Sequence, residues 1–374
     1  MPRFPRHHLA FAPTDHKCER MIDTDDIRAS VAAGILNEKQ AAALTALAHS
    51  RKGAREGLAP GDEPFELFRG FNEIFIITGL AILAIGWVGI VSAVFTTQII
   101  GFRDAALWYG VPGSIVVWLL AEYFVHRRRM VGPANFLAIL FASNTGATLI
   151  SYFAEPFMIG QQDYNSLPFP LVLTTVAVLA FWFRFRVPFA MAMIAMSLFV
   201  IAIILAAIQR GTPENASDLF LLSAAGPFAW ITLGLGIVFF SVAMMFDMSD
   251  PHRVTRRNVN GFWLHVVAAP ALVSTIALSL IDAEQMGILI GVLVIFAIVA
   301  IIIDRRSFLT AAIGYVVALA GTIFGDDGTF NTILILGIIL LILGAFWEKI
   351  RARLLRMMPG FIPLHRLPPA SIDT

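Results

Sequence analysis

The sequence is poor in charged residues. Asp, Glu, Lys and Arg make up 14% of its 374 residues, whereas 58% are hydrophobic and the mean hydropathy is +0.77. Soluble domains contain about 25% charged residues, and a soluble fold of this size could not hide so much apolar surface from water. The composition therefore excludes an ordinary soluble domain and predicts a protein whose main partner is the lipid bilayer.

Cysteine and recognisable reaction motifs are also scarce. Cys18 is the single cysteine, so an intrachain disulfide is excluded. Residues 1–60 contain no long apolar run, and we therefore expect no cleavable signal peptide. The sequence has no Walker loop, HExxH, GxSxG or Cys/His ligand spacing, which predicts a non-enzymatic protein with no metal site, no cofactor and no nucleic-acid partner.

Long hydrophobic segments, in contrast, are abundant. A helical span needs about 20 apolar residues to cross roughly 30 Å of hydrocarbon. The fourth expected span is short, but the prolines at its entry are compatible with a first helical turn. The pattern predicts an all-α polytopic transmembrane helix bundle of about ten spans: Ile74–Phe95, Trp108–Val125, Ala134–Ala154, Leu167–Phe183, Val187–Ile208, Gly226–Phe246, Phe262–Ile281, Met286–Ile303, Ser307–Phe324 and Thr329–Trp347.

The distribution of basic residues supports this count. If the N-terminus is inside and the spans alternate, all but two of the 27 Lys and Arg residues fall in inner loops or tails. The exceptions, Arg103 and Arg210, are outside with most of the acidic loop residues: Asp104, Glu155, Asp163, Glu214, Asp218, Asp282, Glu284, Asp326 and Asp327. Because basic residues concentrate on the cytoplasmic side of membrane proteins, we expect both termini to be cytoplasmic.

Five segments are expected along the chain. Residues 1–21 form a disordered tail, 22–50 a small cytoplasmic helical hairpin, 51–66 a linker, 67–348 the transmembrane bundle and 349–374 a basic cytoplasmic tail. In the hairpin, Gly34 would end the first helix, and Asn37 with Gln40 would form a capping box for the second. Residues 348–358 have the pattern of a basic amphipathic helix suited to an anionic inner leaflet.

Several short stretches carry a resemblance to a known group of proteins. They are AAGILNEKQ at 32–40, FRGFNEI at 68–74, DRRSFL at 304–309, FWE at 346–348 and LPP at 367–369. Together they resemble bacterial multi-span membrane proteins classified as a domain of unknown function, in which a short helical cytoplasmic head precedes about eight to ten spans. The resemblance implies a location in the bacterial inner membrane and transfers no catalytic residue.

Ionisable groups within the expected spans are the first candidates for a functional site, because burying them in lipid is costly. Glu122 lies in the second span, and His126 follows at a spacing that would let the two side chains pair on an α-helix. This arrangement predicts a proton or cation site, or else an interfacial glutamate that reaches the arginines after it. His265 in the seventh span would either couple to protons or pack as a hydrogen-bonded side chain.

Uncharged residues add candidates for helix contacts. Asn135 and Asn144 give the third span a polar face, which usually bonds to another helix. Gly79, Gly86 and Gly89 predict close packing of the first span. No expected span has a charge near its middle, and we expect no set of His, Asp, Glu or Ser residues to meet at one depth, so ion-coupled transport and intramembrane catalysis are disfavoured.

Two functions are consistent with these patterns. The first is a non-enzymatic component that organises or assembles parts of the cell envelope, with the helical head as the docking site for a protein partner. The alternative is a transporter of a neutral or lipidic solute.

The expected topology can be tested by labelling single cysteines in intact cells. In a Cys18→Ser background, Ser249→Cys lies in an expected inner loop and Asp326→Cys in an expected outer one. A membrane-impermeant maleimide should label position 326 in intact cells and position 249 only after the cells are opened. Labelling of both positions from the same side would contradict the alternation.

Overall fold

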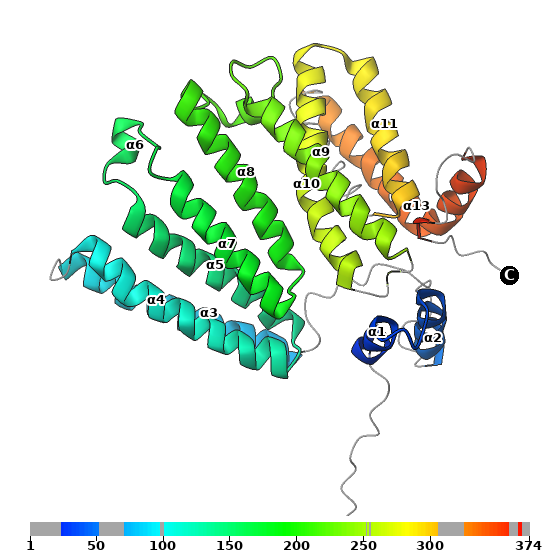
Figure 1. Ribbon diagram of the computed structural model, residues 1–374. Coiled ribbons are helices and arrows are strands. Elements are labelled where there is room, and N and C mark those ends of the chain that lie inside the picture. Colours follow the sequence, from blue (N-terminus) through cyan, green and yellow to red (C-terminus); the bar gives the residue numbers. More distant parts are fainter. Residues whose placement is uncertain are drawn as a thin grey trace, which may run out of the picture. The chain divides into compact units, whose positions relative to one another are not determined.

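The computed structural model describes residues 24–51, 71–97, 101–251, 253, 256–305, 325–358 and 366–368. Within these residues every regular element is a helix (Figure 1). The chain forms two compact units, Met1–Pro60 and Gly61–Thr374. The division between them therefore falls in the segment that the sequence predicts to be a linker.

The first unit contains a pair of short helices. These are α1, Thr24–Ala32, and α2, Glu38–Arg51. Between them Gly34 has a φ of +73°, a conformation that glycine adopts without strain. The Gln40 backbone N–H donates to Asn37 Oδ1 at 2.8 Å, and the Asn37 N–H donates to Gln40 Oε1 at 3.1 Å. The predicted capping box is thus present and fixes the start of α2.

The second unit contains the long apolar helices. In chain order its elements are α3 Phe71–Thr97, α4 Phe102–Ala121, the π-helical turn η1 Glu122–Arg127, α5 Val131–Phe153, α6 Met158–Gln161, α7 Pro168–Phe185, α8 Phe189–Arg210, the 3-10 turn η2 Ala216–Leu219, α9 Phe228–Ser249, α10 Arg256–Asp282, α11 Met286–Ile303 and α13 Gly325–Met357. Eight of the helices are long and apolar enough to cross a membrane. The predicted polytopic helical bundle is confirmed at this level.

The expected spans can be compared with these helices one by one. The first eight coincide with α3, α4 and η1, α5, α7, α8, α9, α10 and α11. The short fourth span is α7, and Pro168 stands in its first turn as predicted. The ninth expected span, 307–324, lies outside the described residues. The tenth falls within α13, which is not among the eight candidate spans.

Helices that follow one another along the chain pack side by side in the second unit (Figure 1). Small residues allow this close approach, as is usual within membranes. A Cβ added to Gly110 of α4 would lie 1.9 Å from Thr148 Oγ1 of α5, and one added to Gly113 would lie 3.0 Å from Asn144 Oδ1. The glycines of α4 are therefore required where α5 crosses it.

The expectation of close packing at Gly79, Gly86 and Gly89 is wrong for the described residues. A Cβ added to any of the three would meet no atom within 4 Å. Their helix, α3, is almost entirely exposed: only 6% of its most apolar stretch is buried against other parts of the protein. A glycine pattern does not distinguish a face that meets protein from one that meets lipid, because lipid tails are as apolar as the helix itself.

Aromatic packing joins α4, α5 and α7. The Trp118 ring lies 5.6 Å from that of Phe141 and 5.0 Å from that of Phe185, centroid to centroid, and Phe141 stacks on Phe181 at 5.0 Å. Phe181 is completely buried. Edge-to-face and offset pairs of this kind add to the stabilisation from burial. A second cluster joins α8, α9 and α10, and a third joins α10, α11 and α13.

The packing at α4 predicts opposite effects for two glycine substitutions. Gly110→Ala should lower the free energy of unfolding by about 1–3 kcal/mol, because the new methyl group collides with Thr148. Gly86→Ala, which meets open space, should be neutral or stabilising by up to about 1 kcal/mol, because alanine favours the helix. Unfolding in mixed detergent would measure both. Equal losses would show that α4 and α5 do not approach as described.

Candidate functional site

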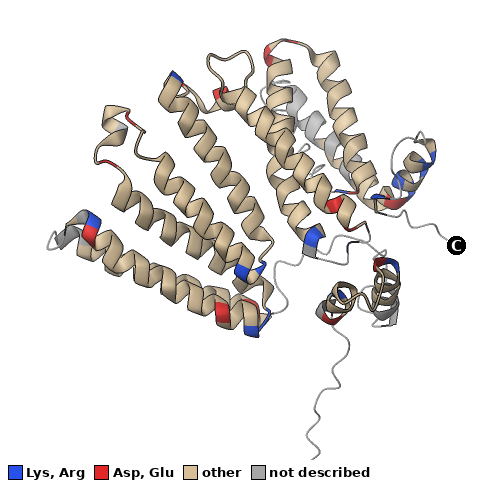
Figure 2. Ribbon diagram, in the orientation of Figure 1, with Lys and Arg blue, Asp and Glu red and all other residues tan. Residues whose placement is uncertain are grey.

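Charged side chains lie at the ends of the long helices, and the middles of the helices are free of them in the described residues (Figure 2). Two groups of charges are nevertheless buried. Both lie where the last turn of α9, the first turns of α10 and the end of α11 come together. We call them the Asp247 cluster and the Asp304 cluster, and they are the strongest candidate for a functional site.

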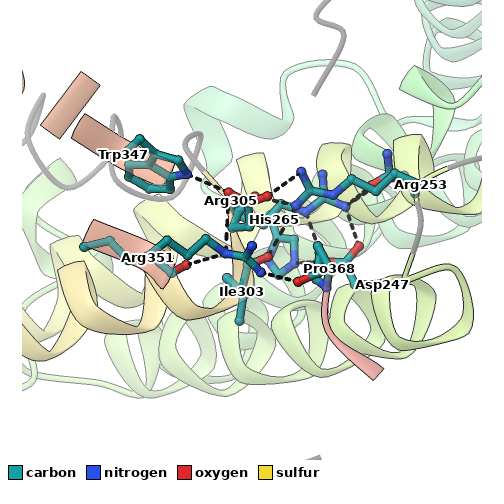
Figure 3. A network of polar contacts seen from close by, with 11 residues as sticks. Asp247, Arg253, His265, Ile303, Arg305, Trp347, Arg351 and Pro368 are labelled. Atoms are coloured by element: carbon teal, nitrogen blue, oxygen red, sulfur yellow. Dashed lines mark hydrogen bonds and ion pairs between the residues drawn. The ribbon is translucent and has the colours of Figure 1, made fainter. Parts of the chain in front are cut away.

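The Asp247 cluster joins α9 to α10 and to the end of α11. His265 Nε2 lies 3.0 Å from Asp247 Oδ2, and Arg305 Nε donates to the same oxygen at 3.0 Å (Figure 3). The second guanidinium nitrogen of Arg305 donates to Asp247 Oδ1 and, at 3.0 Å, to the backbone oxygen of Asn258. The exposed fractions are 5% for Asp247, 0% for His265 and 1% for Arg305. Both carboxylate oxygens therefore have a partner away from water.

A glycine makes room for this cluster. A Cβ on Gly261 would lie 2.4 Å from Asp247 Oδ1 and 3.2 Å from the backbone oxygen of Ala243. The absence of a side chain there lets α9 and α10 approach, and His265 follows one helical turn later on the same face. The sequence thus positions the carboxylate and the imidazole through one small residue.

The Asp304 cluster begins at the residue next to Arg305. Asp304 ends α11 in a left-handed conformation with a φ of 56°. One carboxylate oxygen pairs with Arg253 at 3.1 Å, and the other accepts a hydrogen bond from Trp347 Nε1 at 2.6 Å (Figure 3). Asp304 contacts Arg253 and Trp347 of α13, whereas the next residue, Arg305, contacts Asp247 of α9 and Asn258 of α10. Together Asp304 and Arg305 fix the end of α11 to both α10 and α13.

Arg351 completes the Asp304 cluster. Its Nε donates to the backbone oxygen of Ile301 at 3.2 Å, and another nitrogen donates to the backbone oxygen of Pro368. Burial lowers the pKa of Arg351, while Asp304 raises it and Arg253 lowers it further. An arginine remains protonated at physiological pH despite such a shift. The guanidinium therefore acts as a permanent charge that holds the chain near Pro368 against the end of α11.

These contacts are better suited to holding helices together than to catalysing a reaction. In the described part of the chain, no three His, Cys, Asp or Glu side chains come together as ligands for a metal ion. Breaking a buried ion pair is expensive, because it leaves one charge without compensation. The two clusters consequently restrict how α9, α10, α11 and α13 can move relative to one another.

The structure corrects the interpretation of Glu122 and His126. Residues 122–127 form a π-helical turn, whose backbone hydrogen bonds run between residues five apart. The Glu122 carboxylate instead pairs with Arg184 of α7 at 2.8 Å, while His126 is exposed. Glu122 is thus a half-exposed link between α4 and α7.

Asn144 bonds across helices, as its place in the third span predicts. Its Nδ2 donates to the Gly110 oxygen at 2.7 Å and to Ser114 Oγ at 2.8 Å. Ser114 Oγ also lies 3.0 Å from Thr145 Oγ1. Asn135 is half-buried near the start of α5, and within the described residues it forms no hydrogen bond with Glu122, Asn144 or His265.

His265 is not the isolated histidine that the sequence suggests, and the expectation that no polar set meets at one depth is wrong. Helix α10 begins at Arg256, so His265 lies in its third turn. Asp247 lies one residue beyond the expected sixth span, which ends at Phe246, and α9 continues to Ser249. Arg305 lies in an expected inner loop, yet it is 1% exposed. The sequence offers one signal for this site, an Asp near the end of one helix and a His near the start of the next.

Glu73 is a second residue that the sequence did not single out. It lies in the first turn of α3 and is 4% exposed. Its carboxylate accepts the backbone N–H groups of Val131 at 3.2 Å and Gly132 at 3.0 Å. A carboxylate at a helix N-terminus satisfies free N–H groups and favours the helix dipole. Glu73 therefore caps α5 from a neighbouring helix.

An apolar groove lies between α4 and α5. It has a volume of about 340 Å³. Its walls include Val111, Ile115, Trp118 and Leu119 of α4 and Leu149 of α5. Ser114 and Thr145, which also line it, are bonded to each other. The groove is thus lined mainly by apolar side chains, and none of its lining residues is charged.

Comparison with protein-family models, curated proteins and solved structures finds no match for the chain. The resemblance to bacterial multi-span proteins stays a prediction.

The Asp247 cluster predicts a large effect for one carboxylate and a small effect for another. Asp247→Asn should lower the free energy of unfolding by about 3–5 kcal/mol, because Arg305 would remain buried without its counter-charge. Glu122→Gln, which breaks a half-exposed pair, should cost at most about 1 kcal/mol. Denaturation in mixed detergent measures both.

A double variant separates the ion pair from other effects of Asp247. Asp247→Asn combined with Arg305→Met removes both charges, so its loss should be clearly smaller than the sum of the two single losses. Additive losses would mean that the two side chains do not interact, and the cluster would be refuted.

Proposed function

We propose that the protein is a non-enzymatic, multi-pass component of the bacterial inner membrane that organises or assembles parts of the envelope. In this proposal it has ten spans and two cytoplasmic termini, in accord with the segregation of its basic residues. The observation that carries the proposal is that the buried charges of α9, α10 and α11 are paired with one another at one end of the bundle.

Charges that are paired at helix ends are more typical of helices that stay fixed than of helices that move during a transport cycle. Transporters that couple to ions place ionisable groups near the middle of the membrane and expose them to changing partners. Here Asp247 contacts His265 and Arg305 at once, and Asp304 contacts Arg253 and Trp347. A rearrangement during each transport cycle would have to break several of these buried contacts.

The first unit supplies a candidate docking site. It is compact in itself, and its helices are too short to cross a membrane. The loop between α1 and α2 presents Ile35, which is 74% exposed. In this proposal the exposed Ile35 side chain is an apolar contact for a protein partner. We assign the head to partner binding on this basis.

The groove favours transport of a lipidic solute as the second candidate. Its apolar walls and its position between two candidate spans fit an acyl chain better than a polar molecule. The bonded Ser114 and Thr145 leave few free polar groups for a hydrophilic solute. This candidate needs no partner at the head.

The test is cross-linking and co-purification from native membranes. The full chain, a chain lacking residues 1–60 and an Ile35→Glu variant would be compared, with Lys39→Gln as the matched control because Lys39 is also exposed in the head. The deletion should remove the specific partners, and Ile35→Glu should weaken their recovery by about tenfold, equivalent to 1.4 kcal/mol.

The control variant should behave as the full chain. An unchanged set of partners in the deletion would refute docking through the head and favour the lipid-transport candidate. Size-exclusion profiles of all four proteins would show whether the second unit stays folded.

A further inference from the structure

The last described helix bends where it leaves the apolar region. Phe346 has φ −115° and ψ 16°, which are not helical values, and they divide α13 into an apolar part and a basic part. The basic part runs from Trp347 to Met357 and carries most of the blue residues at the C-terminal end of the ribbon in Figure 2. The bend lets this part take a direction of its own.

One face of the basic part is packed against the bundle. Trp347 is 5% exposed and Arg351 is 4% exposed, and both bond to the end of α11. Ile350 and Leu354 pack on the buried cluster of α10 and α11. These positions repeat every three or four residues, so they form a single side of the helix.

The opposite face carries three positively charged side chains. Lys349, Arg353 and Arg356 are spaced by four and three residues, which places them together on one stripe, and all three are exposed. In the described residues none of these three has an ion-pair partner, whereas the buried Arg253 and Arg305 each pair with an aspartate. We call the three exposed cations the basic stripe.

The depth of the helix follows from its contacts. Trp347 bonds to Asp304, which ends α11, and Arg351 bonds to Ile301 in the last turn of α11. Helix α11 is one of the candidate spans, so its charged end lies at the level of the lipid headgroups. Tryptophan and arginine are typical of this level. The basic stripe therefore lies at headgroup depth, on the side of the helix that faces away from the bundle.

We propose that the basic stripe is a binding site for anionic phospholipid headgroups. Phosphate groups of the surrounding leaflet complement its charge, and each Lys or Arg near an anionic surface contributes about 1 kcal/mol of attraction. Met357, which is 76% exposed, lies at the end of the stripe. The packed face holds the helix in place, so binding requires no folding of the segment.

The experiment places a reporter at the end of the stripe. Full-length Cys18→Ser/Met357→Cys protein, labelled with a polarity-sensitive dye, would be reconstituted in nanodiscs of phosphatidylcholine alone or of an equal mixture with phosphatidylglycerol. Emission should shift to the blue in the mixture, because the stripe draws the label into the interface. Raising the salt from about 0.1 M to about 1 M, which shortens the Debye length from ~10 to ~3 Å, should reverse the shift.

Two charge variants test the stripe itself. Lys349→Gln/Arg353→Gln/Arg356→Gln should weaken the anionic-lipid response by about fivefold per charge, on the order of a hundredfold in all. The charge-retaining variant Lys349→Arg/Arg353→Lys/Arg356→Lys should keep it, and Arg103→Gln/Arg210→Gln, on exposed arginines elsewhere, serves as the matched control.

Three results would overturn the proposal. They are an equal emission in both lipid compositions, a full response of the glutamine variant, or loss of the response in the charge-retaining variant. If the glutamine variant does not reconstitute, the lipid and salt dependence of the starting protein and of the charge-retaining variant still decides the question. A response to soluble acidic polypeptide in phosphatidylcholine nanodiscs, with none to phosphatidylglycerol, would assign the stripe to a protein partner and refute lipid binding.

Discussion

The ion pair between Asp247 and Arg305 is the constraint on which the second half of the bundle depends. An arginine that is 1% exposed is tolerable only if a carboxylate and further acceptors surround it. Asp247 and the Asn258 backbone oxygen provide them, and this fixes the end of α11 against α9 and α10. The adjacent Asp304 is thereby placed to receive Arg253 and Trp347, which in turn position the last helix. A buried ion pair is weak evidence of net stability, but it excludes alternative registers in which either charge lies alone.

The two halves of the bundle use different polar contacts because the cost of a polar group depends on its depth. In α4 and α5 the contacts lie well within the helices, and they are made by neutral groups such as Asn144 and Ser114. In α9, α10 and α11 they lie at the helix ends and are made by ions. Charges near the centre of a bilayer cost more than charges near its surface. Glu73, which caps α5, follows the same rule because it lies in the first turn of α3.

Features that depend on neighbouring residues were predictable from the sequence. The capping box of Asn37 and Gln40, the start of α7 at Pro168 and the eight apolar helices all arise from local patterns. The candidate site arises from contacts between distant residues: Asp247 and Arg305 are 58 positions apart. A hydropathy scale assigns such residues to loops, because it treats each charged residue as unfavourable for insertion into the membrane. It carries no information about a counter-charge on another helix, such as Arg305 for Asp247 or Arg184 for Glu122.

The consecutive residues Asp304 and Arg305 have a consequence for biogenesis. The ribosome releases the chain from the N-terminus, so Asp247 and His265 reach the membrane before Arg305 is made. Arg305 is then missing, so Asp247 of α9 can pair with His265 of α10 but not yet with Arg305. Arg253 is likewise made before Asp304. In this order the contact between α9 and α10 precedes the two clusters, and the adjacent residues Asp304 and Arg305 supply the α11 side of both clusters together.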